Sequence, residues 1–288
     1  MSLNSVVCLP NGRVCHLASP AMRPVAKFMR WEIFKSGQYR RRGFELRPGD
    51  VVVDIGANIG MFALWAEPQI PGGQLVCIEP NPSALECLRK NVDHNALRNV
   101  TIVAAAVGNE AGTMELLCHP TWEALAHNAT IDVPWFNGSW VGKVTRRLVE
   151  RVLQNASQSE AAKLIVAKQL PLSHIMDEHG VTTIDFLKID SEGGEYEILR
   201  GIGAAQWARI ERVVIEYHEF GRGRDHRELV GILRDNGFDV EVACSFLDHL
   251  IAFAGARVGK IWAKKPTRAT DVIPSWSGIP MRPKSTLD

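Results

Sequence analysis

Short apolar runs separated by helical stretches dominate the sequence from residue 49 onward, and this alternation constrains the fold more than any other feature. Apolar strands that are joined by helices are typical of a parallel sheet covered on both faces. We therefore predict an α/β fold with a mostly parallel, seven-stranded sheet that ends in a hairpin-like pair with one antiparallel strand. The expected strands are residues 51–55, 74–80, 100–108, 184–190, 212–218, 238–244 and 260–265.

The segment DIGANIG, residues 54–60, joins the first of these strands to a helix. Glycines permit a tight turn and a close approach to a ligand, and amides at a helix N-terminus carry a small positive charge. The spacing of Gly56, Asn58 and Gly60 differs from the G-x-G-x-x-G of a dinucleotide turn. Asp54 would repel a pyrophosphate but would suit an amine or a sulfonium. A tight turn without a ligand is the alternative interpretation.

The predicted central strands end in polar residues, and the carboxyl ends of parallel strands share the sheet edge at which ligands bind. These residues are Asp54, Glu79, Asp190, Glu216 and His218. Glu79 can accept hydrogen bonds from a ribose diol, a role that fits NAD and S-adenosylmethionine equally well. The small side chains of Ala104, Ala105 and Ala106 either leave room for an adenine ring or serve only helix-to-sheet packing.

The sequence FLKIDSEGGEYEILRG, residues 186–201, concentrates acidic residues after the fourth strand. Asp190, Glu192 and Glu195 are close in sequence, and Gly193 and Gly194 permit a close approach at the turn. Carboxylates are favourable beside a cationic sulfonium or amine and costly beside a pyrophosphate, so this cluster favours S-adenosylmethionine. For Glu195 we prefer the alternative that its charge stabilises a helix N-terminus.

Composition is that of an ordinary globular protein, with 288 residues, 46% hydrophobic residues and a net charge of +1. The near-neutral charge argues against nucleic acid and against a membrane as partners. Six cysteines without C-x-x-C spacing, and the absence of a signal-peptide pattern, lead us to expect a cytoplasmic protein. We expect one domain over residues 1–288 and leave homo-oligomerisation open. The expected parts of this domain are an N-terminal cap at 1–48, an inserted lid at 119–168 and an extended tail at 266–288.

Four motifs together resemble those of the FkbM-type S-adenosylmethionine-dependent methyltransferases: VVVDIGANIGMF, CIEPNPSALECLRKNV, AAVGNEAGTMEL and IDFLKIDSEGGEYEILRG. The likeness covers residues 44–118 and 169–265, and its specific part is the KID-x-EG-x-E block. It implies the class I methyltransferase fold, which is Rossmann-like. It also implies O-methylation of a hydroxyl on a sugar or polyketide-type small molecule, in natural-product or glycan biosynthesis. The long segment at 119–168 departs from the usual pattern, and we expect it to help build the acceptor pocket.

The resemblance also implies roles for individual residues. The methionine end of the cofactor would be lined by Asp54, Gly56, Ala57, Asn58 and Gly60. Glu79 would hold the ribose, and Asp190 would stand beside the reactive centre. Ala105 and Ala106 remain our candidates for the adenine slot.

Methyl transfer to an alcohol requires a group that removes the hydroxyl proton. His218 is our candidate for this base because imidazole titrates near neutral pH, and Asp190 and Glu192 compete with it. A divalent ion such as Mg²⁺, held by Asp190 with Glu216 or His218, is a second possibility.

Three other functions compete with this interpretation. An NAD-dependent dehydrogenase is disfavoured by the glycine spacing and by the acidic strand ends. A non-catalytic S-adenosylmethionine-binding protein would bind the cofactor without turnover. Methylation of nucleic acid is supported only by the basic stretch at 37–43 and by a basic helix expected near Arg147.

Overall fold

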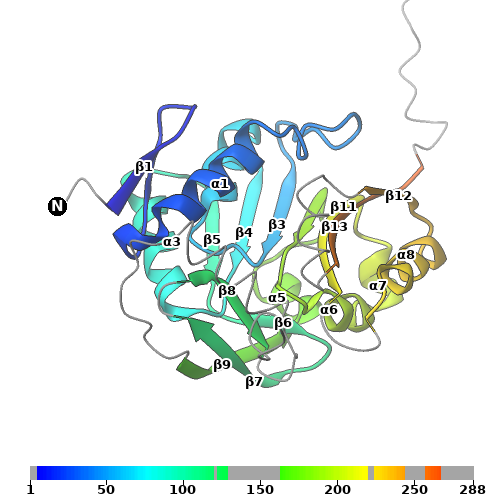
Figure 1. The fold of residues 1–288 in the computed structure, drawn as a ribbon. Coiled ribbons are helices and arrows are strands. Elements are labelled where there is room, and N and C mark those ends of the chain that lie inside the picture. The colour runs from blue at the N-terminus through cyan, green and yellow to red at the C-terminus, as the bar shows by residue number, and fades with distance from the viewer. Residues whose placement is uncertain (1–4, 120–121, 129–162, 220–223, 244–256, 267–288) are drawn as a thin grey trace, which may run out of the picture.

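The computed structural model describes residues 5–119, 122–128, 163–219, 224–243 and 257–266. Its centre is a seven-stranded sheet (Figure 1). From edge to edge its strands are β12 (Asp239–Ala243), β13 (Arg257–Lys264), β11 (Arg212–Glu219), β10 (Phe186–Ile189), β3 (Val51–Ile55), β4 (Gln74–Ile78) and β5 (Val100–Val103). The strands from β11 to β5 are parallel, and β13 is antiparallel to both of its neighbours. The predicted α/β fold with a mostly parallel sheet is confirmed.

Helices cover both faces of this sheet, and alternate strand residues point into two hydrophobic cores. Val53 and Leu187 belong to one core, and their neighbours Val52 and Phe186 belong to the other. The first core is closed by α5 (Leu172–Glu178), α6 (Glu195–Gly201), α7 (Ala204–Trp207) and α8 (His226–Asp235). The second is closed by α1 (Arg23–Phe34), α2 (Met61–Ala66) and α3 (Pro82–His94). Burial on both faces explains why the central strands are apolar throughout.

The stretch at 100–108, which the sequence predicts as one strand, forms two strands in different sheets. β5 ends at Val103, and β6 (Ala106–Gly108) pairs with β9 (Lys163–Pro171) in a second, four-stranded sheet. That sheet also contains β7 (Gly112–His119) and β8 (Trp122–Asn128), and it lies beside the carboxyl ends of the central strands (Figure 1). The single-strand prediction is wrong because the chain changes sheets at Ala104 and Ala105.

The N-terminal region is fastened to the helix that follows β4. A short hairpin of β1 (Val6–Cys8) and β2 (Val14–His16) precedes α1. The fully buried Asn91 of α3 accepts a hydrogen bond from the backbone of His16 at 2.6 Å and donates one to the backbone oxygen of Ile59 at 2.7 Å. One amide side chain therefore joins the hairpin, α3 and the turn after β3.

Several sequence predictions concern segments outside the described residues, including the basic helix near Arg147 and most of the expected lid and tail. In the described part, Arg41 of the basic stretch at 37–43 pairs with Glu241 and lies over the ring of Trp262, 4.6 Å from its centroid. Among the described helices, none combines the length and apolar character needed to cross a bilayer.

Candidate active site

The turn at residues 54–60 packs directly against the end of β10. Gly56 and Gly60 have positive φ angles of 78° and 82°. A Cβ atom at Gly56 would lie 1.8 Å from the backbone oxygen of Asp190, and one at Gly60 would lie 2.4 Å from Cδ1 of Leu88. The turn therefore requires both glycines, for its left-handed backbone and for its close contacts.

The amides of this turn are used inside the protein. Those of Gly56 and Ala57 both donate to the backbone oxygen of Ile78 at 3.0 Å, and that of Gly60 donates to Ala57 at 2.9 Å. The amide of Asn58 donates to Glu79, and that of Ile59 donates to the side chain of Asn58. Residues 56–60 thus offer no free amide to a phosphate, and this supports the choice against a dinucleotide.

Glu79 lies at the end of β4 with both carboxylate oxygens oriented by backbone amides. Oε2 accepts from Asn58 and Oε1 accepts from Asn81, each at 2.8 Å. Burial raises the pKa of Glu79 to about 7, although the two amides oppose this shift. Because each carboxylate oxygen has two lone pairs, the ionised group keeps accepting capacity for a ribose diol.

Asp54 is fully buried, and its charge is balanced by Lys188 from the neighbouring strand β10. The ammonium of Lys188 lies 2.9 Å from Oδ1 of Asp54 and 3.4 Å from Oδ2 of Asp190. Burial raises the pKa of Asp54, and Lys188 opposes this effect. For Asp190, burial is outweighed by Lys188, His218 and Lys260, which together lower its pKa. Lys188, which balances the charge of Asp54, was not among the predicted site residues.

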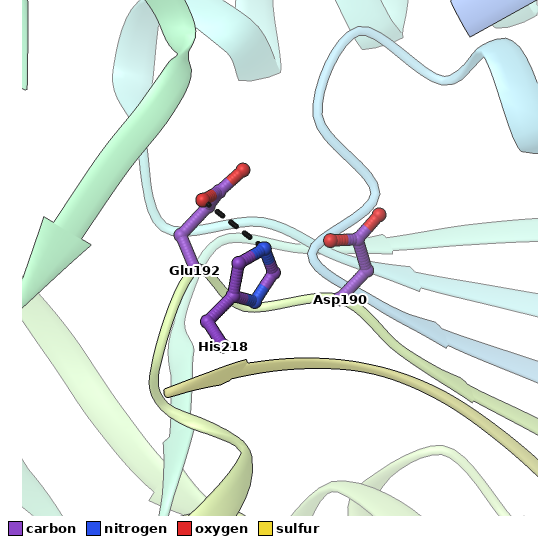
Figure 2. A group of neighbouring side chains, drawn as sticks. All are labelled: Asp190, Glu192 and His218. Carbon is purple, nitrogen blue, oxygen red and sulfur yellow. Dashed lines mark ion pairs between the residues drawn. The ribbon is translucent and has the colours of Figure 1, made fainter. Parts of the chain in front are cut away.

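His218 lies among carboxylates at the end of β11. Its Nδ1 is 3.1 Å from Oε1 of Glu195, and its Nε2 is 3.5 Å from Oε2 of Glu192 and 3.8 Å from Oε1 of Glu216. Burial alone would lower the pKa of His218, but Glu192, Glu195 and Glu216 outweigh it and raise the pKa to about 10. Figure 2 shows that one oxygen of Glu192 faces the imidazole while the other points away from it.

The carboxylate of Glu195 accepts hydrogen bonds from its own turn and also lies beside His218. Its Oε1 accepts hydrogen bonds from the amides of Gly193 at 3.0 Å and Ser191 at 3.2 Å. Glu195 is the first residue of α6, a position that fits the structural role preferred from the sequence. By contrast, Glu192 has a left-handed backbone with φ of 49°, and its carboxylate reaches the cavity.

The N-terminal helix α1 is joined to this cluster by a second ionic group. Lys260 of β13 lies directly across from Glu216 of β11 and pairs with it. The same ammonium lies 2.8 Å from Glu32 of α1. Burial raises the pKa of Glu216 to about 7, with Lys260 opposing the shift. No pattern in the sequence indicates that residues 32 and 260 meet.

One cavity of about 300 Å³ connects these groups. Of the predicted site residues, it is lined by Gly56, Ala57, Asn58, Glu79, Ala105, Ala106, Asp190, Glu192, Glu216 and His218. Asp54 and Gly60 are not among the residues that line it. Its apolar lining includes side chains of α1, β7 and β13, namely Val25, Phe28, Met29, Ile33, Met114, Leu116 and Val258. A second hollow beside Phe44 and Trp262 contains none of the predicted site residues.

The cavity residues fit S-adenosylmethionine, because small side chains, an oriented carboxylate and an acidic end occur in one continuous space. They also include one group that could hold a metal. Asp190, Glu192 and His218 offer ligand atoms within 4.8 Å of one another. The sequence hypothesis considered Glu216 as a metal ligand beside Asp190. In the structure Glu192 belongs to this group, and Glu216 pairs with Lys260 instead.

Fold and cavity together define a class I S-adenosylmethionine-dependent methyltransferase. Residues 54–240 match the family described as the methyltransferase FkbM domain. The chain is 33% identical to 31-O-demethyl-FK506 methyltransferase FkbM of Streptomyces tacrolimicus, over 89% of this chain and 95% of that protein. It is 30% identical to methyltransferase sdnD of Sordaria araneosa, over 75% of this chain and 83% of that protein. The chain therefore belongs to the FkbM methyltransferase family, as its motifs predicted.

Among solved structures, M. jannaschii TYW2 in complex with AdoMet aligns with 92% of this chain and 87% of its own. The sequence identity is 18% and the TM-score is 0.42. Family membership replaces the NAD-dependent dehydrogenase and the non-catalytic binding protein as interpretations of the chain.

Proposed function

We propose that this enzyme methylates a hydroxyl group of a neutral small molecule with a largely apolar body. The observation that carries the proposal is the composition of the cavity on its acceptor side. The lining combines apolar side chains from α1 and β7 with the carboxylates of Asp190, Glu192 and Glu216. In the described lining the basic side chains are Lys188 and His218, and carboxylates already contact both. An anionic acceptor would find no available counter-ion there.

The cofactor would lie across the carboxyl ends of β5, β4, β3 and β10. Ala105 and Ala106 leave room for the adenine, Glu79 accepts from the ribose hydroxyls, and Asp190 faces the cationic end. When bound, S-adenosylmethionine supplies an electrophilic methyl group on a positively charged sulfur. Asp54 and Gly60 would support the site without lining the cavity. Asp54 holds Lys188 in place, and Gly60 permits the backbone conformation of the turn.

The hydroxyl proton would be taken by Glu192, with His218 as the group that positions it. Both ring nitrogens of His218 have carboxylate neighbours, whereas Glu192 has one oxygen directed away from the imidazole. The sequence favoured His218 as this base, with Asp190 and Glu192 as its competitors, and the proposal selects Glu192 from these candidates. A divalent ion on Asp190, Glu192 and His218 is the competing arrangement, because a carboxylate on Nδ1 also orients metal-binding histidines.

Transfer of labelled methyl groups tests the acceptor class. With purified protein and S-adenosyl-L-[methyl-³H]methionine, we expect label in neutral hydroxylated compounds such as 31-O-demethyl-FK506. Sugar phosphates and nucleotide-linked sugars should receive at least roughly tenfold less label, since a buried unpaired anion is costly. Preferential labelling of the anionic compounds would contradict the neutral acceptor.

Glu79→Gln should weaken S-adenosylhomocysteine binding by roughly 10- to 100-fold, the weight of lost charge-assisted hydrogen bonds. Wild-type affinity should rise as the pH increases through about 7, because Glu79 then loses its proton and gains accepting capacity. The variant should lack this pH dependence. Calorimetric titration at pH 6 and 8 measures both effects, and Glu86→Gln on the exposed side of α3 is the matched control. Unchanged affinity would remove Glu79 from the ribose role.

A further inference from the structure

Tyr39, in the cap segment between α1 and β3, is a cavity residue with a fixed ring. It is only 3% exposed and lines the cavity. Its ring centroid lies 4.9 Å from that of Phe62 and 5.7 Å from that of Trp65, both on α2. Because α2 follows the turn at 54–60, this aromatic packing fixes Tyr39 relative to that turn.

The hydroxyl of Tyr39 forms no hydrogen bond with any residue that the structure describes, although the side chain is buried. Acidic groups surround it. Burial first, and then the charges of Asp190, Glu32 and Glu216, raise the pKa of Tyr39 well above its usual range. The group is therefore a neutral phenol with unused lone pairs. Because Tyr39 lines the cavity, its phenol oxygen is available to a ligand bound there.

The surroundings of the phenol select the kind of ligand atom. Asp190, Glu32 and Glu216 line the same cavity, so a carboxylate or phosphate placed beside Tyr39 would meet several like charges. A cationic centre would be attracted by these carboxylates and could also contact the phenol oxygen. In the cofactor orientation proposed above, the sulfonium lies beyond the ribose on Glu79, towards Asp190.

We propose that the Tyr39 hydroxyl oxygen contacts the sulfonium methyl of S-adenosylmethionine and holds it in line for transfer. The inference rests on the proposed cofactor orientation and assigns to the cap a residue that touches the reacting atoms. Oxygen contacts to polarised C–H groups are individually weak, but a positive charge on the neighbouring sulfur strengthens them. Tyr39 would therefore distinguish the methyl donor from its demethylated product.

Tyr39→Phe tests this contact without an acceptor. Dissociation constants for S-adenosylmethionine and S-adenosylhomocysteine are measured by calorimetry on wild type and variant, with thermal unfolding to verify the fold. We expect the variant to bind S-adenosylmethionine roughly fivefold more weakly and S-adenosylhomocysteine within about twofold of wild type. Tyr196→Phe removes a buried hydroxyl that has no hydrogen-bond partner and lies outside the cavity lining, and it should leave both constants unchanged.

Each outcome decides the matter. A selective loss for S-adenosylmethionine supports the sulfonium contact. An equal loss for both ligands overturns it, because the contact would then be with the methionyl group that both contain. No loss for either ligand also overturns it. Failure of the wild-type protein to bind either ligand would instead refute the cofactor orientation on which the inference rests.

Discussion

Lys188→Met is expected to destabilise the folded protein by about 3–5 kcal/mol at pH 8, the cost of leaving a buried charge without its partner. Lys188 is 4% exposed, and its ammonium lies 2.9 Å from Asp54, which is fully buried. Methionine keeps the apolar stem of the lysine and removes its charge. Denaturant unfolding, followed by tryptophan fluorescence, measures the loss.

The pH dependence of this effect identifies its cause. In the variant, Asp54 faces burial without Lys188, so its folded-state pKa rises further above the unfolded value. The stability of such a group is present below the unfolded pKa and is lost as the pH rises through the folded pKa. The gap between variant and wild type should therefore shrink when the pH is lowered from 8 to 5. A gap that does not change with pH would point to packing instead.

Two further variants serve as controls. The double variant Lys188→Met with Asp54→Asn removes both charges and should recover most of the lost stability. Lys90→Met breaks the Lys90–Glu86 pair, whose side chains are 58% and 69% exposed, and should change stability by less than about 0.5 kcal/mol. If the double variant were less stable than Lys188→Met alone, the ion-pair explanation would be wrong.

The cavity residues at strand ends were predictable because the register of a parallel sheet places its carboxyl ends together. Glu79 and Asp190 needed only the strand pattern for their placement, and the acidic turn at 190–195 gave the electrostatic clue. Family membership then followed from the same motifs. The turn amides were harder to judge, since their partners on Ile78 and Glu79 depend on how two strands meet in space.

The residues that the sequence missed depend on contacts between distant segments. Lys188 interrupts an apolar strand, and its meaning appears only when β10 pairs with β3 and places it beside Asp54. Glu32 and Lys260 are 228 positions apart in sequence. The sequence predicted residues 1–48 only as an N-terminal cap. It could not show that Glu32 and Tyr39 would face the acidic end of the cavity.

Glu192→Gln is expected to reduce the rate of methyl transfer by roughly 10²- to 10⁴-fold, the usual contribution of a general base. Glutamine has nearly the same size and can still contact Nε2 of His218, but it cannot take a proton from an acceptor hydroxyl. Single-turnover rates with a neutral acceptor that is labelled in the transfer assay measure the loss. Because Glu79 and the adenine slot are untouched, S-adenosylhomocysteine affinity should stay within about twofold.

A matched control and a metal-depleted sample separate the base from its competitors. Glu197→Gln changes a residue of α6 that pairs with Arg224 outside the cavity lining, and it should retain the wild-type rate. If chelation leaves the wild-type rate intact while Glu192→Gln loses it, Glu192 acts on the proton directly. If chelation abolishes the rate and Mg²⁺ restores it, Asp190, Glu192 and His218 act as ligands. Full activity of Glu192→Gln with a large loss in Glu216→Gln would transfer the role of base to Glu216, the other carboxylate near Nε2 of His218.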